Sequence, residues 1–215
     1  MSANQDAPYK KEMDTLTQYF EKAKDNQTLL IQIGEDPIGT LQAMGIAVED
    51  KFNEPVKMQL QTASGKTANQ ATAREAERMS AEVRKIKDTV PAAPAAPTGL
   101  RIVQEAVPPN VPNALEFLLK PWGLVLVVRE PAINYLQGGG VISAGVLSGV
   151  GGVASAMGPF GVLVGVILAI CAAALSIYAG IIQITDKGKG VYLTWTWAQL
   201  IPGLPQYGLP VVTAV

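Results

Sequence analysis

The longest uncharged stretch of the chain is PAINYLQGGGVISAGVLSGVGGVASAMGPFGVLVGVILAICAAALSIYAGIIQIT, residues 131 to 185. It contains no Asp, Glu, Lys or Arg over 55 consecutive positions. A protein surface in water rarely goes so far without a charge, because its side chains must be solvated. We therefore expect this stretch to be buried, in a bilayer or inside a protein.

The length of the stretch favours two crossings of a bilayer. Residues 139–157 and 160–183 each provide the roughly 20 apolar positions that a helix needs to cross about 30 Å of hydrocarbon. Gly158 and Pro159 lie between them and favour a turn. The sequence therefore predicts a hydrophobic, glycine-rich helical hairpin that spans the membrane.

Small residues recur at intervals of four along both segments, so each set falls on one face of a helix. In lipid, such faces allow the close backbone approach that holds helices together. We expect the two segments to contact each other and further copies of the chain, although small residues are also common in membrane helices generally. The predicted contact residues are Gly140, Ala144, Gly145, Ser148, Gly149 and Gly152 in the first segment and Gly161, Gly165, Ala169 and Ala173 in the second.

The segments on either side of the hairpin carry basic and aromatic residues. Lys120 and Arg129 precede it and Lys187 and Lys189 follow it, which favours both ends on one side of the membrane. Residues 191–197 alternate as a strand does. They either pair with residues 181–185 through a turn at 186–190 or contribute to an aromatic belt at the membrane interface. That belt would contain Trp122, Tyr192, Trp195 and Trp197.

The first half of the chain is polar. Residues 1–100 carry 12 basic and 14 acidic side chains, against 5 and 4 in the remainder. Helical spacing predicts an amphipathic helix from Tyr9 to Ala23 and a second, polar helix over residues 68–89 that opens at Thr67. Asp36 and Pro37 form a helix start, with a stop at Gly45. Residues 56–60 alternate, which predicts a short strand.

Proline at every third position over residues 91–97 favours an extended spacer. We therefore divide the chain into a polar helical region (1–90), a Pro/Ala linker (91–98), a pre-membrane segment (99–130), the hydrophobic hairpin (131–185) and an aromatic, proline-rich tail (186–215). In the pre-membrane segment we expect a strand at 100–107 and a short helix from Asn113 through Leu119, because Asn113 and Glu116 have capping spacing.

Several function classes find no support in the composition. The net charge of −1 gives no electrostatic basis for binding nucleic acid, and the chain has no histidine. The sequence Ser64-Gly65-Lys66-Thr67 lacks the earlier glycine of a phosphate-binding loop. The one cysteine, Cys171, is expected to be a buried apolar residue. We expect no cofactor, no metal and no enzyme activity.

The expected fold is therefore mainly α, with polar amphipathic helices, a transmembrane helical hairpin and a short β-like tail. The organisation is similar to that of pore-forming colicins, in which polar helices shelter a hydrophobic hairpin. We expect a membrane protein without a cleavable signal peptide that self-associates and permeabilises a bilayer, as a toxin or translocator does. The alternatives are an anchored scaffold, whose residues 1–90 bind a soluble partner or which belongs to a membrane-containing particle, and a soluble symmetric assembly that buries the glycine-rich segments.

Overall fold

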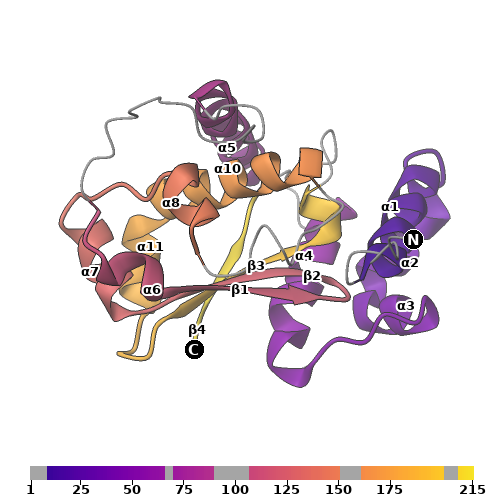
Figure 1. Cartoon of the computed structure of the whole chain (residues 1–215). Coiled ribbons are helices and arrows are strands. Elements are labelled where there is room, and N and C mark those ends of the chain that lie inside the picture. The colour runs from indigo at the N-terminus through magenta and orange to yellow at the C-terminus, as the bar shows by residue number, and fades with distance from the viewer. Residues whose placement is uncertain (1–8, 66–69, 90–106, 151–160, 201–207) are drawn as a thin grey trace, which may run out of the picture.

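The computed structural model describes residues 9–65, 70–89, 107–150, 161–200 and 208–215. Within these ranges the protein is mostly helical and contains a small antiparallel sheet (Figure 1). The expectation of a mainly helical protein is confirmed at this level. The sheet is larger than the predicted β-like tail, because two of its four strands come from residues 115–128.

The N-terminal helices follow their apolar spacing and their caps. Helix α1 (Lys10–Ala23) buries Leu16, Phe20 and Ala23, as predicted. Helices α2 (Gln27–Glu35) and α3 (Pro37–Ala43) follow it. The Asp36 carboxylate accepts a hydrogen bond from the Gly39 amide at 2.9 Å, and Gly45 adopts a φ of +77° just after α3 ends. The predicted start and stop of this helix are confirmed.

The predicted strand at residues 56–60 is wrong. A short 3-10 helix, η1 (Asp50–Phe52), leads directly into helix α4 (Asn53–Ala63). The buried positions of α4 include Val56, Leu60 and Ala63, whose spacing of three and four fits a helix. The alternation that suggested a strand covers only five residues, and burial against neighbouring helices outweighs so short a local pattern.

The sheet has the order β1-β2-β3-β4, and each neighbouring pair is antiparallel. Strands β1 (Leu115–Lys120) and β2 (Gly123–Val128) form a hairpin. The predicted helix through Leu119 is therefore wrong: helix α6 (Asn110–Asn113) ends where it was expected to begin. Pairing between two apolar segments joined by a tight turn outweighs the capping spacing of Asn113.

Strand β3 (Val191–Thr196) confirms the alternating pattern of the tail. Its partners are β2 and β4 (Val211–Ala214), with Leu193 opposite Leu126 and Val212. The predicted pairing with residues 181–185 is wrong, because that segment forms helix α11 (Ala179–Thr185). A further 3-10 helix, η3 (Trp197–Leu200), follows β3.

The remaining helices lie over the sheet (Figure 1). Helix α10 (Gly161–Ile177) packs against α8 (Ala144–Ser148), and α5 (Gln70–Thr89) packs along α10. Helix α7 (Glu130–Gln137) contacts α11 at one end of the molecule, whereas α1 to α3 form a group at the other end. The polar helix predicted over residues 68–89 is thus confirmed as α5, although its cap at Thr67 lies outside the described residues.

The two faces of the sheet have different covers. Cross-strand partners share a face, so Trp195 lies on the same face as Leu124, and Tyr192 on the same face as Val127. The Trp195 indole donates to the Gly208 carbonyl at 2.9 Å, and Gly208 lies beside Ile170 of α10. The Tyr192 ring contacts Phe52 of η1, on the α4 side. Helix α10 therefore covers one face, and η1 with α4 covers the other.

A buried polar network fixes α4 to the sheet. The side-chain amide of Gln59 lies against the part of β3 that follows its pairing with β4. Its Oε1 accepts from the Thr196 amide at 2.7 Å, and its Nε2 donates to the Thr194 carbonyl. The Gln199 side chain donates back to the Gln59 carbonyl at 3.0 Å. Gln59 thus continues the ladder of β3 as a neighbouring strand would. The hydroxyl of Thr194 is buried without a hydrogen-bond partner among the described residues.

Candidate functional site

Helix α10 is apolar on every side and enclosed by the rest of the protein. Nine consecutive residues, Ile167 to Leu175, are each at most 5% exposed. A helix at the surface of a domain buries a stripe and leaves the opposite face in water. The continuous burial of α10 shows that protein surrounds it on all sides along this stretch. Cys171 lies at its centre, buried as expected.

Helix α5 forms the outer cover of α10. It turns Met79 and Val83 inward, both buried, whereas Glu77, Arg78 and Arg84 are exposed. Lys85 and Glu82 form an ion pair at 3.2 Å on its surface. The described contact between the two helices is therefore a narrow apolar seam beneath a charged surface.

Gly208 lies where α5, α10 and the start of β4 meet. Its φ of +83° favours glycine, and a Cβ placed there would lie 3.0 Å from Cγ of Met79 and 3.7 Å from Cγ2 of Ile170. The missing side chain therefore allows the backbone near Gly208 to pass close to both helices. This contact links the seam to the Trp195 indole, which donates to the Gly208 carbonyl.

Tyr178 marks a break between α10 and α11. The helical segments Val164–Ile177 and Ala179–Thr185 meet at an angle of 70°. The Tyr178 side chain is 6% exposed and forms a hydrogen bond with the Glu75 side chain of α5. The cover helix is therefore attached to the bend as well as to α10.

The predicted pair of membrane-crossing helices is not what the described residues form. In residues 139–150 the helical part is α8, which has five residues and is capped by Ser143. Gly139, at a φ of +83°, follows the end of α7 and turns the chain away from a continuous helix. The second segment is interrupted at Tyr178. The predicted turn at Gly158-Pro159 lies outside the described residues.

Within the described residues, no single helix is long and apolar enough to cross a membrane. The broken pair Val164–Ile177 and Ala179–Thr185 meets the requirements of length and composition when its two parts are taken together.

The predicted helix-packing residues occupy different environments. Ala144, Ala169 and Ala173 are buried, Gly145, Ser148 and Gly149 are exposed, and Gly165 is half-buried. Gly140 lies against the ring of Tyr135, where a Cβ would collide with it. Gly161 begins α10, and Gly152 lies outside the described residues.

Space around three of these glycines is open. A Cβ at Gly165 would meet no described atom within 4 Å, and at Gly145 and Gly149 the nearest atoms would be 3.6 and 3.4 Å away. Packing within the described part of the chain therefore does not require glycine at these positions. Their role in contacts between copies of the chain stays a prediction.

The aromatic residues predicted to lie at a membrane interface are largely buried in this fold. Trp122, Trp195 and Trp197 are buried, and Tyr192 is half-buried. The Trp122 indole donates to the Glu49 carboxylate at 2.9 Å, and the Trp197 indole donates to the Pro121 carbonyl at 2.9 Å. A belt at a membrane surface would require these residues to leave their present partners, and their role there stays a prediction.

Glu49 joins η1 to the β1–β2 turn, an arrangement that sequence reasoning missed. Its carboxylate accepts from Lys120 as well as from the Trp122 indole. Burial by itself raises the pKa of Glu49, but these two hydrogen bonds and the Lys120 charge outweigh it, and the net pKa is below its usual value. The ammonium groups of Lys51 and Lys120 also lie 4.9 and 5.7 Å from the centre of the Phe52 ring.

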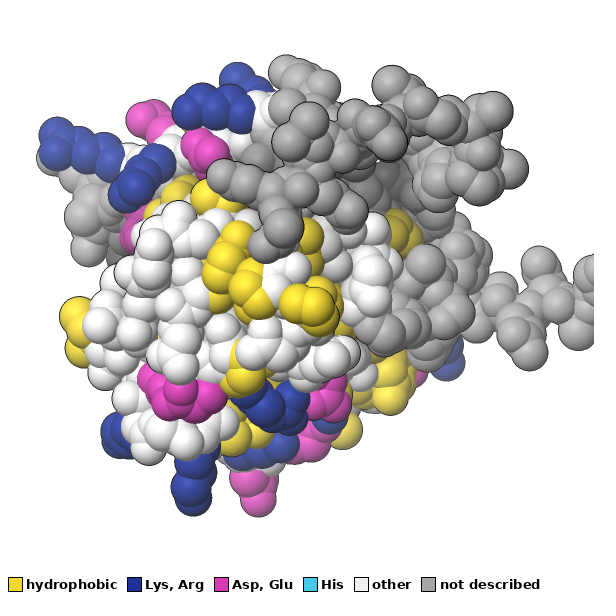
Figure 2. Space-filling model, turned by 60° about the vertical axis from the view of Figure 1, so that its left-hand side comes forward, with side chains coloured by type: hydrophobic (Ala, Val, Ile, Leu, Met, Phe, Trp, Pro, Cys, Tyr) yellow, Lys and Arg dark blue, Asp and Glu magenta, His cyan; other side chains and the backbone are white. Residues whose placement is uncertain are grey.

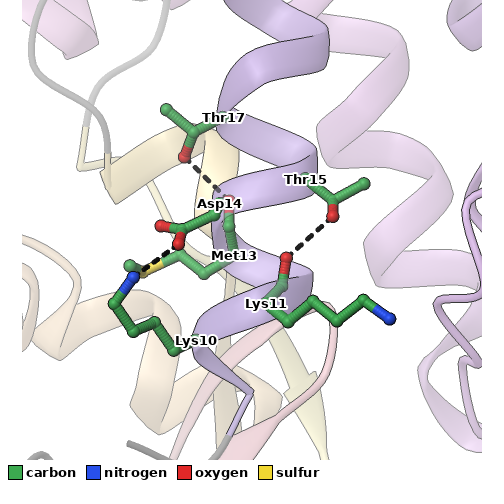
Figure 3. A network of polar contacts seen from close by, with 6 residues as sticks. All are labelled: Lys10, Lys11, Met13, Asp14, Thr15 and Thr17. Carbon is green, nitrogen blue, oxygen red and sulfur yellow. Dashed lines mark hydrogen bonds and ion pairs between the residues drawn. The ribbon is translucent and has the colours of Figure 1, made fainter. Parts of the chain in front are cut away.

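The polar side chains of α1 bond mainly within their own helix (Figure 3). Lys10 pairs with Asp14 at 2.6 Å, while the Thr15 and Thr17 hydroxyls donate to the carbonyls of Lys11 and Met13 at 2.7 and 2.8 Å. These side chains lie along the first two turns of the helix and do not converge on a common point. Among the described residues, no group of three Asp, Glu, Cys or His side chains is arranged to hold a metal.

We therefore take one region as the candidate functional site. It consists of the enclosed helix α10, the bend at Tyr178 and the covering helix α5. Comparisons with protein families, with curated proteins and with solved structures found no match to this chain.

Proposed function

We propose that this protein inserts into membranes and permeabilises them, with α10 and α11 as the inserting unit and α5 as the cover that shelters it beforehand. The observation that carries the proposal is the enclosure of α10, which is uncharged and apolar on every face. Such a helix matches the interior of a bilayer as well as it matches a protein core.

The cover is the part that must move. If α5 departs, the apolar surface beneath Met79 and Val83 meets water, at a cost of roughly 25 cal/mol for each Å² exposed. A bilayer removes that cost by accepting the same surface. The contacts that hold α5 are a narrow seam and the hydrogen bond between Glu75 and Tyr178. The hydrogen bonds that fix α4 to the sheet through Gln59 do not involve α5.

The small residues of α10 support self-association in lipid. Gly165, Ala169 and Ala173 share one face, and the open space around Gly165 is not needed by the described fold. In a bilayer this face allows a second helix to approach closely. We propose that the inserted unit forms a homo-oligomer through it.

A membrane-anchored scaffold is the second candidate. It is favoured by the scarcity of polar side chains that are able to line a pore. The exposed polar side chains in the described part of the uncharged stretch are Asn134, Gln137, Ser143, Ser148, Ser176 and Gln183. In this version the inserted unit holds the protein to the membrane, and the polar helices α1 to α4 bind a soluble partner.

The experiment compares dye release from liposomes with flotation of the same samples. Release together with flotation supports permeabilisation, whereas flotation without release supports the scaffold. A protein that neither floats nor releases dye contradicts both.

Gly165→Lys tests whether α10 itself enters the bilayer. Its position offers open space in the described fold, but a lysine in the hydrocarbon is costly, up to about 2.5–3.5 kcal/mol at the bilayer centre and less toward the interface, where Gly165 near the start of α10 would lie. We expect the variant to keep its circular dichroism spectrum and to lose most release. Met58→Lys adds the same charge to an exposed position of α4 and serves as the matched control. Equal loss of release in both variants would contradict a specific role for α10.

A further inference from the structure

Helix α11 presents an apolar face to solvent. Ile181 and Ile184 lie three residues apart, on the same side of the helix, and are 46% and 85% exposed. Ile182, between them in sequence, is fully buried and anchors α11 to the protein. Figure 2 brings this end of the molecule forward and shows apolar side chains gathered among uncharged ones, with both basic and acidic side chains along the lower edge.

A basic turn follows this face directly. Lys187 and Lys189 are exposed, and no carboxylate of the described residues forms an ion pair with either. The one acidic residue of the turn, Asp186, bonds to its own backbone: its Oδ1 accepts from the amides of Gly188 at 2.9 Å and Gly190 at 2.8 Å. The turn therefore holds its carboxylate on the backbone and leaves two ammonium groups in water.

The turn is fixed in place against the sheet. Gly188 and Gly190 have φ values of +82° and +100°, which glycine adopts without strain. A Cβ at Gly190 would collide with the carbonyl of Val128, so the chain passes close to the end of β2 there. The two lysines are therefore carried on an ordered support next to the exposed isoleucines.

We propose that this α11 docking surface, formed by Ile181, Ile184, Lys187 and Lys189, binds the surface of an anionic lipid bilayer. Isoleucine side chains enter the boundary of the acyl chains while ammonium groups remain among acidic headgroups, so the two kinds of residue act on one target. The surface belongs to the broken helical pair whose composition suits a membrane. The inference rests on the proposed function, since it names the surface and the lipid class of the first contact.

The two components contribute through different forces. Each exposed lysine near an anionic surface contributes enough to change binding about fivefold, and salt weakens this attraction. Loss of both isoleucines removes apolar burial and is expected to weaken binding by about tenfold or more. The lysine contribution should therefore depend on ionic strength, whereas the isoleucine contribution should not.

The test measures flotation of the full chain with vesicles of phosphatidylcholine alone and of phosphatidylcholine mixed with phosphatidylserine. We expect wild-type protein to prefer the anionic vesicles. I181S/I184S should lose binding at every salt concentration, and K187Q/K189Q should lose the preference for phosphatidylserine. I31S/M58S replaces two residues that are 51% and 54% exposed on α2 and α4, and should bind as wild type does.

Three outcomes would overturn the inference. The first is equal flotation of wild type and both α11 variants, and the second is equal binding of wild type to neutral and anionic vesicles. The third is binding of the same surface to an acidic protein with no affinity for vesicles. Its failure is separable from that of the proposed function. Dye release from neutral vesicles without preference for anionic ones contradicts the docking surface alone, whereas preferential binding without release contradicts permeabilisation alone.

Discussion

Helices α4 and α5 both cover the interior of this protein, but they are attached in different ways. Helix α4 contributes Gln59, whose side-chain amide is hydrogen-bonded to β3 and whose main-chain carbonyl accepts from the Gln199 side chain inside the core. Helix α5 contributes Met79 and Val83 to an apolar seam on α10, and its Glu75 carboxylate accepts a hydrogen bond from the Tyr178 hydroxyl. Departure of α4 would strand several buried polar groups of the sheet. Departure of α5 would break the described side-chain hydrogen bond at Tyr178 and expose an apolar seam that another apolar medium is able to cover.

Replacing Gln59 should have the largest effect on stability. Gln59→Leu removes the shorter bond of the Thr196 amide, which keeps its 3.2 Å bond to Gln199 Oε1, and removes the Gln59 donor from the Thr194 carbonyl. A buried polar group that loses its partner costs about 1–3 kcal/mol. We expect a loss of about 3 kcal/mol in the free energy of unfolding, measured by urea denaturation. Gln61→Leu is the control, because Gln61 is partly exposed on the same helix. Equal losses in the two variants would contradict a special attachment of α4.

Shortening Met79 should weaken the other cover. Met79→Ala removes a fully buried side chain and is expected to cost about 2 kcal/mol. Because the seam is local, we expect hydrogen exchange to accelerate first at the amides of α10 and dye release to increase. Glu77→Ala changes an exposed residue of α5 and should do neither. Uniform acceleration of exchange across the sheet would show that α5 is not a separate unit.

Glu49 should make the stability of the face covered by η1 and α4 depend on pH. Its folded pKa is lowered, so its stabilising contribution is present above the unfolded pKa of about 4.3 and is lost as the pH falls through the folded value. Glu49→Gln should cost about 1 kcal/mol at neutral pH, since the residue is partly exposed. The difference from wild type in urea denaturation should shrink on acidification. A difference that grows at low pH would reverse the assigned sign.

The smallest expected effect is at Gly165. Gly165→Ala fills open space within a helix and should stabilise the described conformation by about 0.5–1 kcal/mol, seen as a higher melting temperature. A lower melting temperature would mean that a neighbour approaches Gly165 after all. Gly208→Ala is the contrasting change, because a Cβ there meets Met79 and the φ is positive, and it should destabilise.

The sequence was informative wherever the decisive contacts are local. The spacing of Leu16, Phe20 and Ala23 predicted α1, and Asp36 with Pro37 predicted the start of α3. The uncharged stretch correctly indicated a helix that avoids water, which is α10. The alternation in residues 191–197 predicted β3.

The errors arose where distant segments decide the structure. Strand β1 became visible only through its pairing with β2, and Glu49 meets Trp122 across 73 residues. Gly180 lies two residues after the bend at Tyr178, but a single glycine does not fix a bend, and the Tyr178 partner Glu75 belongs to a helix far away in sequence. Local periodicity does not report such contacts. Only the structure shows that α5 covers α10 and that Glu75 contacts Tyr178.

The central claim is that α10 leaves its cover and enters the bilayer, and its depth in the bilayer tests this most directly. An environment-sensitive fluorophore on Gly165→Cys, in a Cys171→Ala background, would be quenched by nitroxides placed at different depths in the lipid acyl chains. We predict strong quenching by deep nitroxides and none by iodide in the water, while the same label on Met58→Cys behaves in the opposite way. Quenching of the Gly165 label by iodide alone, in membrane-bound protein, would contradict the account.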